Sequence, residues 1–81
     1  MTKEEYILNL RQMYCKGDVV RLLASSDKEM MKKHFNDYMI IDYVDDEGQI
    51  HGQWIIGRGS LAINLEEDVI VKEKLKTAAT R

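Results

Sequence analysis

Three residues of this chain have side chains that could act as nucleophiles, general bases or zinc ligands: Cys15, His34 and His51. A cysteine beside a histidine can form a reactive thiolate–imidazolium pair, and cysteine and histidine together can bind zinc. The sequence spacings of the three residues match neither chemistry. Cys15 is also expected in the last turn of a helix, where the helix dipole opposes thiolate formation. We therefore predict no catalytic residue and no metal ligand among them.

Residues 57–62 read GRGSLA, which matches the glycine-rich turn that binds pyrophosphate in dinucleotide-binding folds. In such folds a parallel strand follows the helix and an acidic residue stands about 20 positions after the glycines. Here the last acidic residue is Glu73, and the strand before Gly57 is expected to pair antiparallel in a hairpin. We predict no cofactor, and we interpret the two glycines as allowing a sharp exit from a sheet.

An acidic cluster, Asp42 with Asp45, Asp46 and Glu47, precedes Gly48 and suggests a calcium loop. With Gly48 at the sixth position of such a loop, the first and twelfth ligands would be Tyr43 and Trp54, which cannot bind calcium. We interpret the acidic residues as the solvated tip of a hairpin, where their charges also oppose edge-to-edge aggregation.

Asp42 and Trp54 are the more specific candidates for a ligand or polar core position. In an uninterrupted hairpin over 38–44 and 50–56, Asp42 falls on the apolar face of the sheet opposite Gly52, and the absence of a side chain at Gly52 leaves space next to Asp42. A carboxylate placed there could bind a ligand or a basic group of a partner, together with His51. Pairing of Asp42 with an Arg or Lys of the same chain is the alternative.

The element expected to position these residues is a β-hairpin over 38–44 and 50–56. Two runs rich in Ile, Val, Tyr and Trp flank residues 45–48, whose composition is typical of a tight turn. With Gly48 in the left-handed conformation, Asp45 lies opposite Gln49. Continued without interruption, this register places Ile40 opposite Trp54 on an apolar, even-numbered face. We predict that face to be the core, with Trp54 at its centre.

Helix caps and apolar spacing predict the flanking elements. Capping-box patterns at residues 2–5 and 26–29 predict helices over about 3–15 and 27–35, and Asp18 after Gly17 predicts a short helix over 18–24. After Ser60 we predict a short third strand at 61–64 and a helix at about 66–77, with one long helix as the alternative. Residues 77–81 are predicted to be a frayed tail. The predicted fold is a single α+β domain with helices on a small antiparallel sheet.

The composition restricts the function classes. The chain has 81 residues, 44% of them hydrophobic and 32% charged, as expected for one small globular domain. Its 12 basic and 14 acidic residues give a net charge of −2, which makes nucleic-acid or anionic-membrane partners unlikely. A lone cysteine and an N-terminus without a long apolar run are typical of a cytoplasmic protein.

The odd-numbered face of the predicted hairpin is too apolar to be simply solvated. We predict an interaction surface there, formed by Met39, Ile41, Tyr43, His51, Gln53 and Ile55. The leading hypothesis is a small non-enzymatic interaction module that dimerises or binds a protein partner, as many bacterial or phage-encoded regulators and inhibitors do. The alternatives are a ligand-binding or enzymatic domain that uses Asp42, His51 and Trp54, and a nucleic-acid-binding domain.

Overall fold

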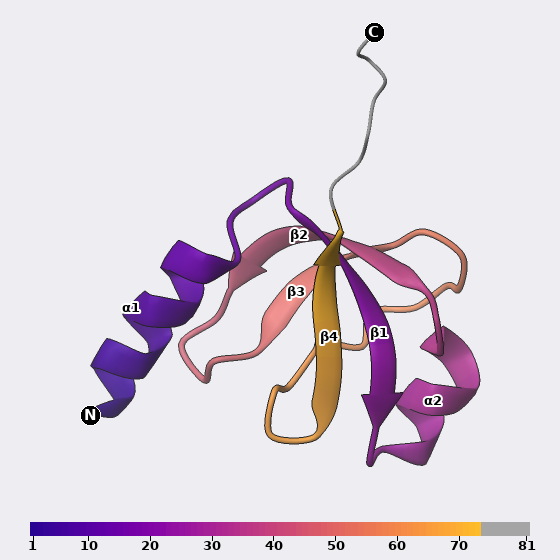
Figure 1. Cartoon of the computed structure of the whole chain (residues 1–81), viewed down its shortest axis with the longest axis horizontal. Coiled ribbons are helices and arrows are strands. Elements are labelled where there is room, and N and C mark those ends of the chain that lie inside the picture. Colours follow the sequence, from indigo (N-terminus) through magenta and orange to yellow (C-terminus); the bar gives the residue numbers. More distant parts are fainter. Residues whose placement is uncertain (74–81) are drawn as a thin grey trace, which may run out of the picture.

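The computed structural model describes residues 1–73 and shows a small α+β fold (Figure 1). Its elements in chain order are α1 (Lys3–Met13), β1 (Val19–Ser25), α2 (Lys28–His34), β2 (Tyr38–Val44), β3 (Ile50–Trp54) and β4 (Asp68–Glu73). The strands form one antiparallel sheet in the order β3-β2-β1-β4. In Figure 1 α1 lies to the left of the sheet and α2 to its lower right, and neither crosses in front of β1 and β4. The predicted fold class, helices with a small antiparallel sheet, is confirmed.

The helix α1 begins where the sequence predicts, and α2 begins one residue later than predicted. The Thr2 hydroxyl accepts a hydrogen bond from the Glu5 amide, and the Glu5 carboxylate accepts one from the Thr2 amide, which completes the capping box of α1. At α2 the cap is Asp27, whose carboxylate accepts from the amides of Glu29 and Met30. The predicted helices over 3–15 and 27–35 therefore correspond to α1 and α2, each two residues longer than observed.

Residues 18–24, predicted as a helix, instead lie almost entirely in the strand β1. This strand is central, because it pairs with β2 on one edge and with β4 on the other. Asp18 does not cap a helix; its carboxylate accepts a hydrogen bond from the Cys15 amide and closes the turn before the strand. Two β-branched residues begin the strand, and burial of Val20 and Leu22 fixes it in the sheet. Tertiary pairing on both edges overrides the local capping signal.

The elements predicted after Ser60 are also wrong where the structure describes them. Residues 61–64 form no third strand of the sheet beyond a single antiparallel bridge between Ile63 and Ile50. Asp68–Glu73 is the strand β4 and not part of a helix over 66–77, since its centre is a β-branched run that pairs with β1. The remainder of that predicted helix, and the predicted frayed tail at 77–81, lie outside the described residues.

The hairpin turn forms as predicted. Gly48 has a φ of 83°, in the left-handed region, and its amide donates to the Asp45 carbonyl. The Asp45 amide donates to the Gln49 carbonyl at 2.9 Å, so these two residues lie opposite each other. The pairs Val44–Ile50 and Tyr43–His51 follow in the predicted register.

A β-bulge at Asp42 then shifts this register by one residue. Beyond the bulge Ile41 pairs with Gly52 and Met39 pairs with Trp54, whereas the uninterrupted register predicts Ile40 opposite Trp54. The predicted even-numbered core face is therefore wrong for the first half of β2. Met39 and Ile41 point into the core with 0% and 1% of their surface exposed, and Ile40 points away from it with 40% exposed.

The core lies on one face of the sheet, and Trp54 is buried in it as predicted. Both helices and the segment after β3 contribute to this same cluster, through Leu10, Met30, Leu61, Ile63 and Leu65. The helices and this segment thus pack on one face of the sheet, which we call the core face. Within residues 1–73, neither helix has the length and apolarity required to cross a membrane.

Candidate functional site

The residues with nucleophilic or metal-binding side chains are dispersed. Cys15 is exposed just after α1, His34 is the last residue of α2, and His51 is in β3. Within residues 1–73, no three acidic, histidine or cysteine side chains are grouped so that they could hold a metal ion.

Asp42 and Trp54 do not share a site. The bulge turns Asp42 out of the sheet, where its carboxylate is exposed and lies 3.8 Å from the Lys16 ammonium. The predicted core position of Asp42 is therefore wrong, because the bulge was not foreseen. Trp54 lies in the core, and its indole N–H donates to the Leu61 carbonyl at 2.9 Å.

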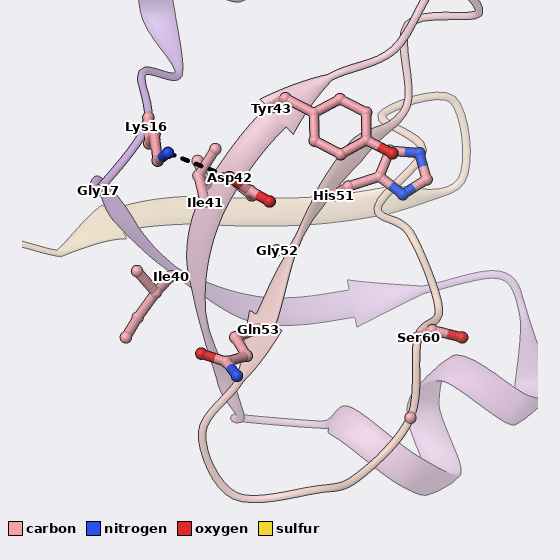
Figure 2. A pocket seen from close by; sticks show the side chains of 11 residues that line it. Lys16, Gly17, Ile40, Ile41, Asp42, Tyr43, His51, Gly52, Gln53 and Ser60 are labelled. Atoms are coloured by element: carbon pink, nitrogen blue, oxygen red, sulfur yellow. Dashed lines mark ion pairs between the residues drawn. The ribbon is translucent and has the colours of Figure 1, made fainter.

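Asp42 and His51 instead line a common groove along the hairpin, which we call the hairpin groove (Figure 2). The groove has a volume of about 570 Å³ and is formed by β2, β3, the turn before β1 and the loop after β3. Its lining residues with polar side chains are Lys16, Asp42, Tyr43, His51, Gln53 and Ser60. Gly52 is required at this point of the sheet, because a side chain there would overlap the Ile40 carbonyl.

One wall of the groove carries His51, whose imidazole pairs with a carboxylate outside the groove lining. His51 Nε2 lies 2.7 Å from Asp45 Oδ2, and the Tyr43 ring stacks on the imidazole with ring centroids 4.7 Å apart. The hydrogen bond with His51 lowers the pKa of the Asp45 carboxyl, assisted by the amides of Gln49 and Glu47 and opposed by partial burial. The ionised carboxylate therefore fixes His51 to the hairpin turn.

A second carboxylate–imidazole pair is fully buried and was missed from the sequence. Asp37, between α2 and β2, accepts hydrogen bonds from the amides of Tyr38, Ile56 and Gly57, and its Oδ2 lies 3.0 Å from His34 Nδ1. Burial raises the pKa of the Asp37 carboxyl, but the four hydrogen bonds together outweigh burial and lower the pKa. The only sequence signal was an acidic residue in the short link between a helix and an apolar strand.

The glycine-rich segment after β3 packs against this buried pair. His34 stacks on Trp54 with ring centroids 3.9 Å apart, and its Nε2 is buried without a hydrogen-bond partner. A Cβ atom at Gly57 would lie 2.7 Å from the Lys33 carbonyl oxygen and 2.9 Å from His34 Nδ1. Gly57 is therefore glycine because the chain passes directly over the end of α2.

The face of the sheet opposite the core, which we call the outer face, carries two rows of cross-strand neighbours. One row is Glu73, Val19, Ile40 and Gln53, and the other is Val71, Arg21, Tyr38 and Ile55. Five large apolar side chains on this side are 38–55% exposed: Leu23, Ile40, Ile55, Val69 and Val71. The Arg21 guanidinium and the Glu73 carboxylate form an ion pair at 2.9 Å between the rows.

The predicted interaction residues therefore separate into three groups. Met39 and Ile41 are buried in the core, which corrects their assignment to an exposed face. Tyr43 and His51 line the hairpin groove, and Gln53 and Ile55 belong to the outer face, where Gln53 also borders the groove. The outer-face residues of β1 and β4 were missed, because neither segment was predicted to be a strand.

Comparisons of the chain with protein-family models, with curated proteins and with solved structures find no match. The functional conclusion therefore rests on the geometry of this chain.

Proposed function

We propose that the protein is a small non-enzymatic interaction module that binds a protein partner through the outer face of its sheet. The observation that supports this is the exposure of five large apolar side chains on one sheet face, while the described helices and loops contribute to the core on the other face. Contiguous apolar surface of this kind is typical of protein–protein contacts.

The exposed side chains of the outer face are of the kinds that stabilise an interface. Ile40 lies on β2 and Ile55 directly follows β3, with 40% and 54% of their surfaces exposed. Removal of apolar surface from water stabilises a complex by about 25 cal/mol per Å², so covering this face stabilises it by several kcal/mol before the entropic cost of association. Tyr38, half-buried between Arg21 and Ile55 in its row, provides an aromatic side chain of the type enriched at interface centres.

The charges of the outer face define the chemistry of the partner. Arg21 and Glu73 neutralise each other, and Lys16 and Asp42 pair at the neighbouring groove. A partner surface that is apolar at its centre and has no unpaired charge fits this face, because a single charge buried there would be left without compensation. We place this interaction in the cytoplasm on the sequence evidence given above.

A non-enzymatic role is supported by how the titratable side chains are used. The Asp37 and Asp45 carboxylates are each engaged by backbone amides and an imidazole, so they hold the fold together. In the described part of the chain, the lone thiol of Cys15 lies near the carbonyls of Arg11 and Gln12 and near no histidine.

The test replaces Ile40 and Ile55 together by Lys, with the double variant Leu8→Lys, Met13→Lys as the matched control. Leu8 and Met13 are 57% and 54% exposed on α1, so the control adds the same charge at two exposed apolar positions away from the sheet. Proteins captured by the parent from its host would be identified, purified and titrated against all three chains by calorimetry. We expect a purified partner to bind the parent and the control equally, and the Ile40→Lys, Ile55→Lys variant at least about tenfold more weakly. Equal binding to all three chains, or no protein enriched by the parent over the Ile40→Lys, Ile55→Lys variant, would contradict the proposal.

The hairpin groove supports a second candidate function, the binding of a small polar ligand. Asp42 and His51 line it together with the amide of Gln53 and the hydroxyl of Ser60. A ligand that raises the melting temperature of the parent but not of an Asp42→Asn, Ser60→Ala variant would favour this function. Proteins that bind the parent and the groove variant equally would favour the interaction module.

A further inference from the structure

The strand β4 has an edge that the described residues leave open. Within residues 1–73, β4 pairs with β1 and with no other strand, so its second edge presents unpaired backbone N–H and C=O groups along its centre. At its start the Asp68 amide already donates to the Asn64 carbonyl at 2.8 Å. Val69 and Val71 are 55% and 38% exposed on the outer-face side.

The edge of β4 has no proline, and the bulge between β1 and β4 lies at Leu23, on the β1 side. Its charged side chains Asp68 and Lys72 stand at the two ends of an apolar centre, residues 69–71, so they protect the ends of this edge but not its middle.

Two copies of this strand, placed side by side in opposite directions, would bring matching side chains together. Residues 68–72 read Asp-Val-Ile-Val-Lys. In an antiparallel pair of two such strands centred on Ile70, each Val69 faces a Val71 of the other copy and Ile70 faces Ile70. At both ends an Asp68 faces a Lys72. Apolar residues thus meet apolar residues and opposite charges meet, which is the arrangement that stabilises cross-strand pairs.

Other registers lack this match. A shift of the centre by one residue, to Val71, would place Val69 opposite Glu73 and Ile70 opposite Lys72. The charged side chains at the two ends of the central register differ in freedom. Asp68 is 5% exposed, and its carboxylate accepts hydrogen bonds from the Ser25 hydroxyl and the Asn64 amide, while Lys72 is half exposed and ends 3.3 Å from Asp18. Lys72 of one copy can therefore reorient toward the negative charge of Asp68 in the other copy, without a direct ion pair.

We infer that two copies of this chain associate through antiparallel pairing of their β4 strands, centred on Ile70. The two four-stranded sheets then form one sheet of eight strands, and the two outer faces become continuous on the same side of it. This inference rests on the proposed function in one respect: the dimer doubles the surface that binds the protein partner. The contact is isologous, so each copy contributes the same residues, and its closed symmetry limits the assembly to a dimer.

The test uses two double variants that differ at one position. Val69→Glu with Val71→Glu places like charges opposite each other twice across the predicted contact. Val69→Lys with Val71→Glu places opposite charges there twice. Both variants put Glu at position 71, beside Arg21 of the same chain, so they alter the monomer similarly there. All substituted side chains lie on the outer-face side and not in the core.

Sedimentation equilibrium over a concentration series measures the association of the full-length parent and of both variants, with circular dichroism melting as a check that each is folded. We expect a dimer for the parent, a dissociation constant raised about tenfold to a hundredfold for the Glu/Glu variant, and recovery toward the parent for the Lys/Glu variant. A parent that stays monomeric would overturn the inference, and its β4 edge is then covered by other residues of the chain or by another protein. Equal weakening in both variants would overturn the register.

A third chain separates this inference from the proposed function. The Ile40→Lys, Ile55→Lys variant is altered on β2 and just after β3, away from the β4 edge. We expect it to dimerise like the parent while it loses the protein partner. A monomeric parent that binds a partner would overturn the dimer alone, and a dimer that binds no partner would overturn the proposed function alone.

Discussion

The two carboxylate–imidazole pairs of this fold, His34–Asp37 and His51–Asp45, have the same chemistry in different surroundings. Their nitrogen–oxygen distances are 3.0 and 2.7 Å, and each imidazole stacks on an aromatic ring. The side chains of the first pair are 0% and 2% exposed, while those of the second are 29% and 28% exposed. The contribution of each pair to the stability of the fold therefore depends on its burial and on the segments that it joins.

Their connectivity differs as much as their burial. Asp37 accepts hydrogen bonds from the amides of Ile56 and Gly57, about twenty residues later in the chain, and so joins the start of β2 to the segment after β3. Asp45 binds amides only within its own turn and an imidazole six residues away. The first pair therefore stabilises the tertiary structure, whereas the second stabilises a turn that Gly48 already favours.

The largest effect is expected from Asp37→Asn. Loss of the negative charge leaves the buried amides and the His34 imidazole with a weaker acceptor, and disruption of such a buried pair costs about 3–5 kcal/mol. Urea denaturation of the parent and of the variant measures this difference. A loss below about 1 kcal/mol would show that the buried pair is replaceable.

Acidification should reproduce part of that loss in the parent. The pKa of the Asp37 carboxyl is lower in the folded chain than in the unfolded chain, so the unfolded chain binds the proton more tightly. The stabilisation is therefore complete above the unfolded pKa and disappears as the pH falls through the folded pKa. Urea denaturation at a series of acidic pH values should show a steeper loss for the parent than for Asp37→Asn. Parallel curves would contradict this assignment.

The smallest effect is expected from Asp45→Asn. The pKa of this carboxyl is also lowered, mainly by the hydrogen bond with His51, but the group is partly solvated and water can replace its partners. We expect a loss of about 1 kcal/mol, as for an ordinary hydrogen bond. A melting temperature lowered as much as in Asp37→Asn would show that the turn contributes as much as the buried pair.

Features that depend on neighbouring residues were predictable from the sequence. The capping box of Thr2 and Glu5 needs only one helical turn, and the left-handed Gly48 needs only the hairpin tip. The burial of Trp54 followed from its place in an apolar strand. The residue pairs of the hairpin next to the turn, such as Tyr43 with His51, were predictable from the type of turn.

The bulge at Asp42 is the point at which prediction of the candidate site failed. One extra residue in β2 exchanges the two faces of the strand, so that Met39 and Ile41 enter the core and Ile40 leaves it. An apolar run with Ile and Met on both faces fits either arrangement, and the choice depends on how β2 packs against β1. The presence of exposed apolar side chains on the sheet was therefore predictable from the sequence, whereas the identity of the exposed residues was not.

The sequence by itself determined the cap of α1, the hairpin turn and the α+β class, because each depends on contacts within a few residues or on composition. Only the tertiary structure decided that residues 19–25 form a central strand, that Asp37 is bound to His34 and to the amides after β3, and that β4 pairs on one edge alone within residues 1–73. These features depend on pairing between segments far apart in the chain. Such pairing is stabilised by burial and hydrogen bonds that form only when the whole sheet is assembled.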